Sequence, residues 1–141
     1  MRAHRVSDLK WSWSGDIEVS DIGDLAVTAS STTDSFVQEV QTRLRSDLED
    51  WEMVPTLGAS LSDLIGEPND QKIAEEGKTR IVSSLVRDAF CDINRISVRY
   101  VPVSRHHILY GIQISLPDMD PTKFIEFSLL FDTNENDVMF L

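Results

Sequence analysis

The spacing of apolar residues changes once along this chain, and the change near Arg95 constrains the fold more than any other feature. Before this point, apolar residues recur every three or four positions, which is the period of an amphipathic helix. After it, apolar and polar residues alternate, which is the period of a strand with one buried face. We therefore predict an α+β fold in which two main helices pack on a C-terminal antiparallel β-meander, preceded by a short N-terminal strand.

The first helix is predicted to begin at Thr33 or Asp34, either of which can accept hydrogen bonds from the free amides of the first turn. Its apolar stripe consists of Phe36, Val37, Val40, Leu44 and Leu48. The opposite side carries Gln38, Gln41, Arg45 and Glu49. We expect these four polar side chains to remain in water while the stripe packs on the sheet.

The second helix is predicted from about Asp70 to Phe90, with Ile73, Gly77, Ile81, Leu85 and Ala89 recurring every four residues. Glycine inside a helix costs up to about 1 kcal/mol relative to alanine. Its presence on the apolar stripe therefore predicts that another element approaches the helix closely at Gly77.

The remaining elements are short. A strand is predicted at Asp24 to Thr28, a loop held by Trp51 at 50–58, and a short helix from Ser60 to Ile65 that ends at Gly66. Alternating segments then predict strands around 98–100, 108–114, 125–131 and 138–141, with turns at 104–107 and 117–122. Strands so close in sequence favour a meander.

Size and charge limit the function. The chain has 141 residues, a formal net charge of -11 and one cysteine, Cys91. This length fits one domain, which we place at 21–141 behind an N-terminal arm at 1–20. The negative field argues against nucleic acid as a partner, and no apolar run is long enough to span a membrane. Without an export signal or a disulfide pair, synthesis in a reducing cytoplasm is expected.

Motifs that could carry chemistry are incomplete, so we predict no catalytic residue, metal or cofactor. Gly77-Lys78-Thr79 lacks the earlier glycine of a phosphate-binding loop, because Lys72 stands there. A calcium loop starting at Asp132 would need a glycine where Asp137 stands. His106 and His107 are adjacent and would point to opposite faces of an extended segment.

One catalytic alternative remains from the residues alone. The carboxylates around the loop at 50–58 could supply the acid and the base of a small lysozyme-like hydrolase. They are Glu49, Asp50, Glu52 and Glu67. A solvated acidic loop is the simpler interpretation, and Cys91 is expected to be a buried, inert thiol.

Three segments carry a resemblance to a known family: GDLAVT at 23–28, DSFVQEVQTRLRS at 34–46 and WEMVPTLG at 51–58. In this order, followed by a long helix and a sheet, they resemble the sheath-initiator or baseplate wedge family of contractile-tail phages and related injection systems. The resemblance covers about residue 21 to the C-terminus. It implies a structural protein of the virion baseplate, assembled in the host cytoplasm, and not an enzyme.

The resemblance also implies partners. They are the tail sheath protein, the baseplate wedge proteins and the tail tube or hub. The family often carries a Glu-Pro-Arg triplet after the long helix, where this chain has Ile93-Asn94-Arg95 and an aspartate one place early. By position, wedge contacts are expected at Asp92, Asn94 and Arg95.

The residues themselves favour a further binding element at the C-terminal strand. Val138, Met139, Phe140 and Leu141 form an apolar segment with nothing after it to cover a sheet edge. An open edge can accept a strand from another protein, so we predict partner contacts at these four residues and at Phe131. Two alternatives remain, namely that the segment only closes the domain's own sheet, or that the chain is a soluble adaptor unrelated to phage tails.

Overall fold

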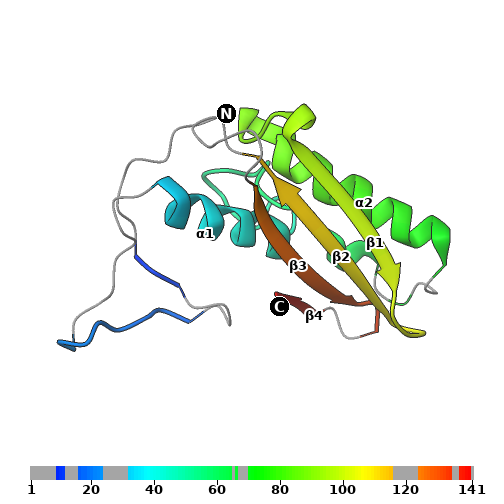
Figure 1. Cartoon of the computed structure of the whole chain (residues 1–141), viewed down its shortest axis with the longest axis horizontal. Helices are drawn as coiled ribbons and strands as arrows, with labels where there is room; N and C mark the ends of the chain where they lie inside the picture. Colours follow the sequence, from blue (N-terminus) through cyan, green and yellow to red (C-terminus); the bar gives the residue numbers. More distant parts are fainter. Residues whose placement is uncertain are drawn as a thin grey trace.

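A four-stranded antiparallel sheet and two main helices form the protein, which confirms the predicted α+β class (Figure 1). The computed structural model describes residues 9–11, 16–23, 32–64, 66, 70–115, 124–134 and 137–140. Helix and strand side chains share one core, which includes Val40, Leu85, Tyr110 and Leu129. The helices therefore cover one face of the sheet and leave the other face open.

The sheet is the predicted meander. Its strands are β1 (Ile96–Pro102), β2 (His107–Ile114), β3 (Ile125–Asp132) and β4 (Asp137–Phe140), in the order β1-β2-β3-β4. Each neighbouring pair is antiparallel. The predicted strand at 24–28, the turn at 117–122 and Leu141 lie outside the described residues.

Helix α1 (Thr32–Arg45) places three stripe residues, Phe36, Val40 and Leu44, in the core. Some expectations for this helix are wrong. Leu48 is 41% exposed because α1 ends at Arg45, before the stripe can continue. Gln41, expected in water, is buried because a wider part of the helix surface than the apolar stripe packs against the rest of the protein.

Helix α2 (Gln71–Val86) begins at Asp70, whose carboxylate accepts a hydrogen bond from the Ile73 amide at 2.9 Å. It ends earlier than predicted. Asp88 and Ala89, in the 3₁₀ turn η2 (Arg87–Ala89), have φ angles of 61° and 56°, so the chain leaves the helical path before Phe90. As a result Ala89 is exposed, whereas Phe90 turns into the core.

The connection between the helices also follows prediction in part. Trp51 donates its indole N–H to Ser46 Oγ at 2.9 Å and remains half-exposed. The short helix appears as the 3₁₀ segment η1 (Leu61–Leu64), and Gly66 after it has the predicted left-handed φ of 80°. No helix among the described residues is long and apolar enough to cross a membrane.

Candidate protein-binding edge

Strand β4 is the last strand of the described sheet and pairs on one side with β3. The register places Phe140 opposite Leu129 and Val138 opposite Phe131. In an antiparallel pair, every second residue directs its N–H and C=O to the partner strand, and the residues between direct theirs the other way. About half of the backbone polar groups of β4 therefore face away from β3.

Side chains of β4 alternate between the two faces. Val138 is partly buried against the core and Phe140 is 7% exposed, with the Arg45 guanidinium carbon 4.8 Å from its ring centroid. Met139 points to the open face and is 48% exposed. Phe131 is fully buried in β3, so the expectation that its side chain contacts a partner is wrong.

The open face of the sheet carries an apolar row that crosses all four strands. Register pairs join Val101 to Leu109, Leu109 to Leu130, and Leu130 to Met139. The two end members are the most exposed, at 58% for Val101 and 48% for Met139. The row therefore reaches both edges of the sheet.

The two edges differ in how they are protected. Edge strands of natural sheets often carry charges or proline, which discourage pairing with another chain. Strand β1 has both, in Arg99 and Pro102, and Arg95 directly precedes it. Strand β4 has no proline and no basic residue, and its only charge is Asp137 at the start. The β4 edge is therefore the better acceptor for an added strand.

The three residues expected to contact wedge proteins lie elsewhere. Asp92 precedes the 3₁₀ turn η3 (Ile93–Arg95), and its carboxylate accepts a hydrogen bond from the Asn94 amide at 3.0 Å. Asp92, Asn94 and Arg95 are all exposed. This turn leads into β1, and β1 and β4 are three strand spacings, or about 14 Å, apart across the sheet. The structure thus keeps the two predicted contact regions apart.

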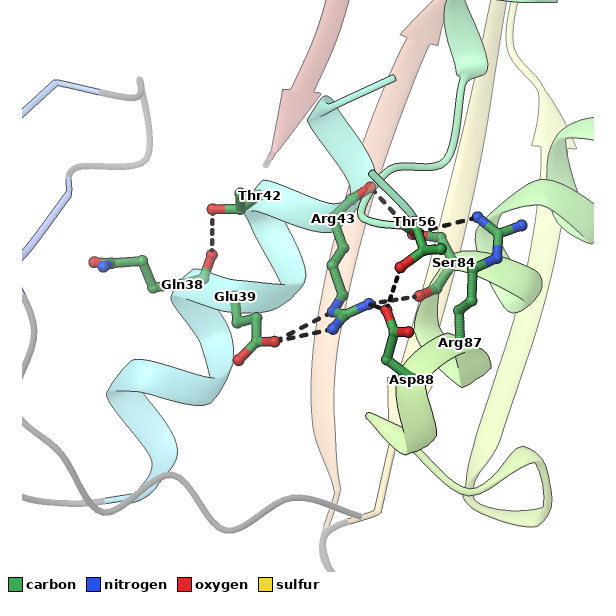
Figure 2. Close-up of polar contacts among 8 residues, drawn as sticks. All are labelled: Gln38, Glu39, Thr42, Arg43, Thr56, Ser84, Arg87 and Asp88. Carbon is green, nitrogen blue, oxygen red and sulfur yellow. Dashed lines mark hydrogen bonds and ion pairs between the residues drawn. The ribbon is translucent and has the colours of Figure 1, made fainter. Parts of the chain in front are cut away.

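A buried arginine holds the helices together, and the sequence interpretation missed it (Figure 2). Arg43 is 1% exposed and donates to Glu39 Oε1 at 3.1 Å and to the Ser84 carbonyl at 3.3 Å. Its Nη1 lies 3.7 Å from Asp88 Oδ2, and its guanidinium carbon lies 4.4 Å from the Phe90 ring centroid. This arrangement joins α1 to the end of α2.

The same cluster reaches the loop between the helices. Thr56 donates to Asp88 Oδ2 at 2.9 Å, and its carbonyl accepts a hydrogen bond from Arg87 at 3.4 Å (Figure 2). Arg87 also donates to the Gly58 carbonyl at 3.2 Å. The sequence did contain a signal for this cluster. Arg43 lies three positions after Val40, on the stripe side of α1, and four positions after Glu39, so this spacing predicts a buried ion pair between Arg43 and Glu39.

The catalytic alternatives gain little from the geometry. Glu49, Asp50 and Glu52 are exposed on the loop surface, and Asp50 accepts a hydrogen bond from the Asp47 amide at 2.8 Å. Glu67 lies outside the described residues. Burial raises the pKa of the Cys91 thiol to about 12, against which the opposing effect of Arg43 is smaller, so the thiol stays protonated at neutral pH.

A serine, a histidine and an aspartate do meet at the β1–β2 turn. His107 Nδ1 lies 2.7 Å from Ser104 Oγ, and His107 Nε2 lies 3.3 Å from Asp132 Oδ2. Acyl transfer also needs amide donors for the oxyanion. The amides of Val103 and Ser104 both donate to the His107 carbonyl, so they are already occupied. The contacts between Ser104, His107 and Asp132 therefore stabilise the turn. No group of three or more metal-binding side chains occurs among the described residues.

Comparisons with protein-family models, curated protein sequences and solved structures gave no match to this chain.

Proposed function

We propose that the chain is a structural baseplate protein of a contractile tail, which joins the baseplate wedge to the first sheath ring and starts sheath assembly by accepting a strand at β4. The observation that carries this proposal is the terminal position of β4 in the described sheet, together with the absence of proline and of basic residues from this strand. Strand addition pairs the backbone groups that β4 leaves facing outward. The resemblance of 34–46 and 51–58 to the sheath-initiator family supplies the identity of the assembly.

The register of β4 limits what the added strand can be. Its residue beside Met139 would lie on the open face and extend the apolar row, whereas its neighbours would face the helix layer beside Val138 and Phe140. The expected occupant is an extended, mostly apolar segment of the sheath protein.

Backbone methylation tests this pairing directly. Of the neighbouring Val138 and Met139 amides, one points to β3 and the other to the free edge. A semisynthetic chain N-methylated at the amide that points to β3 should unfold more easily. A chain N-methylated at the amide that points to the free edge should keep its stability and no longer nucleate sheath in a mixture with the purified sheath protein. If neither derivative weakens nucleation, the edge is not used.

Side-chain variants give a second test with a matched control. Met139→Lys adds a charge to the outer end of the apolar row at β4, and Val101→Lys adds the same charge at the β1 end. We expect the first variant to slow sheath nucleation and the second to leave it unchanged. Deletion of 138–141 should likewise abolish nucleation, and normal sheath assembly by that truncation would contradict the proposal.

The wedge contact is tested at the other side of the sheet. Arg95→Glu should weaken binding to the wedge proteins, whereas Arg99→Glu, a similarly exposed change on β1, should not. The alternative of a soluble adaptor makes a different prediction, because β4 would then bind a strand from a protein outside the tail. Imaging purified particles for this chain beside the first sheath ring separates the two.

A further inference from the structure

The loop between α1 and η1 exposes apolar side chains although its backbone is closed by hydrogen bonds. Trp51, Met53 and Val54 are all exposed, and Met53 reaches 92%. The Glu49 amide donates to the Pro55 carbonyl at 2.9 Å, and the Val54 amide donates to the Trp51 carbonyl at 3.0 Å. Tryptophan and methionine are enriched at protein interfaces. The loop therefore presents an apolar surface of fixed shape to a partner.

Two carboxylates border this surface, which we call the apolar loop and define as residues 48–54. Glu49 and Glu52 are both exposed. Neither side chain forms an ion pair or a hydrogen bond with another residue in the described part of the chain. Both carboxylates are thus available to cations of a docking partner.

A surface of the opposite charge lies along β1 and the turn after it. It consists of Arg99, Val101, Val103 and Arg105, which are all exposed and which we call the β1 strip. Arg99 and Val101 lie on the open face of the sheet, because they are two residues apart and Val98 next to Arg99 is buried. Neither arginine has a side-chain hydrogen bond or an ion pair with any residue that the structure describes. The strip therefore offers two guanidinium groups beside two exposed valines.

The apolar loop and the β1 strip cannot meet within one copy. The loop is attached at the end of α2, where Thr56 donates to Asp88 Oδ2 at 2.9 Å. The strip lies on the opposite face of the sheet and runs toward the start of α2, where Tyr100 donates to Glu75 Oε1 at 2.7 Å. From Glu75 to the end of α2 is about 16 Å along the helix. Contact between loop and strip therefore requires two molecules.

We propose that the apolar loop of one copy docks on the β1 strip of a second copy. Charge complementarity identifies the occupant, because one chain carries both the unpaired carboxylates and the unpaired arginines. In this contact the arginines bind the carboxylates, while the apolar side chains of the loop cover the valines of the strip. Since the two surfaces differ, the contact is head to tail, and each added copy presents a further loop or strip.

The net charge of the chain makes this association weak. Each copy carries a net charge of -11, so distant parts of two copies repel each other. At physiological salt this repulsion is screened beyond about 8 Å, whereas the paired groups are in contact. Few side chains take part on each side, so we expect association at protein concentrations of about 100 µM, which is typical of a transient contact.

Sedimentation velocity of the full chain at about 10–500 µM tests the proposal. Wild-type protein should form dimers and larger species as its concentration rises. A loop variant, Glu49→Arg with Glu52→Arg, should weaken this association about tenfold or more, although it brings the net charge closer to zero. Wild-type protein that stays monomeric, or a loop variant that associates as strongly, would overturn the proposal.

Mixing variants tests the head-to-tail arrangement. A strip variant, Arg99→Gln with Arg105→Gln, should also be monomeric alone. An equimolar mixture of the loop and strip variants should form a heterodimer and nothing larger, because only one intact loop and one intact strip remain in each pair. A mixture that stays monomeric would overturn the proposal, and circular dichroism checks that both variants are folded.

A matched control removes the same charge elsewhere. Lys72→Gln with Lys78→Gln on α2 should change the association by less than about threefold. Met139→Lys on β4 should also leave it unchanged, so pairing between β4 edges is distinguished from loop docking. Equal weakening by the α2 control would show that net charge alone governs association. Sheath nucleation and wedge binding are measured with other proteins, so the failure of either function test is separate from failure here.

Discussion

Gly77 of α2 lies directly against the hydroxyl of Tyr110 on β2, and a β-carbon at position 77 would overlap that oxygen. The hydroxyl donates a hydrogen bond to the Ala74 carbonyl at 3.0 Å, in the preceding turn of the helix. Tyr110 is fully buried. The close approach predicted from a glycine on the apolar stripe is thus confirmed, and it sets the distance between α2 and the sheet.

Replacing this glycine should destabilise the protein in spite of helix propensity. Gly77→Ala gains up to about 1 kcal/mol from propensity. It loses more by forcing Tyr110 away, and we expect a net loss of about 1–3 kcal/mol in the free energy of urea unfolding. Thr79→Ala on the exposed side should change it by less than about 0.5 kcal/mol. If Gly77→Ala lowered the unfolding free energy equally in the wild-type and in the Tyr110→Phe background, this result would contradict the contact.

Removing the buried arginine should have a larger effect. Arg43→Met removes the ion pairs to Glu39 and Asp88 and the hydrogen bond to the Ser84 carbonyl, which join α1 to the end of α2. Breaking a buried ion pair costs about 3–5 kcal/mol, measured by thermal unfolding. Arg80→Met is the control, since Arg80 pairs with Asp63 and Glu76 at the surface and should cost less than about 1 kcal/mol. Similar losses for both variants would argue against the cluster.

The fold could be predicted because the periodicity of apolar residues in each helix and strand can be read from a short stretch of sequence. Strand alternation at 108–114 and 125–131 gives both the buried face and the antiparallel order. Helix ends depended on backbone geometry that the pattern does not encode. Asp88 adopts a left-handed conformation, and its carboxylate is held there by Thr56 and Arg43, which come from elsewhere in the chain.

The elements proposed to bind partners were predictable only in part. The position of β4 at the sheet edge followed from its place in the meander, and alternation alone distinguishes Met139 from its buried neighbours. Phe131 was misassigned although it shares the alternation of Phe127 and Leu129, which are buried. The antiparallel pairing of Trp11 with Ile17 was missed because the paired segments are very short, and the Gln38 contact with Trp11 spans 27 residues in sequence.

Stability should fall in alkaline solution because of Cys91. Burial raises the pKa of its thiol from 9.0 to about 12, so the folded protein keeps a proton that the unfolded chain releases. The contribution is fully present below about pH 9 and is lost as the pH rises toward 12. Cys91→Ala should therefore show a shallower fall in the urea-unfolding free energy between pH 8 and about 10. Identical slopes for both proteins would refute the assignment.

The attachment of the 9–11 strand to α1 can be tested separately from the stability of the core. Gln38→Ala removes both hydrogen bonds to the 9–11 strand and leaves the apolar stripe of α1 untouched. We expect exchange of the Trp11 amide hydrogen to accelerate about fivefold, because one hydrogen bond is worth about 1 kcal/mol. The free energy of global unfolding should change by less than about 0.5 kcal/mol. Gln113→Ala, which removes a surface bond to Glu126, is the matched control and should leave Trp11 exchange unchanged. Unaltered Trp11 exchange in Gln38→Ala would mean that these two hydrogen bonds do not hold the 9–11 strand against α1.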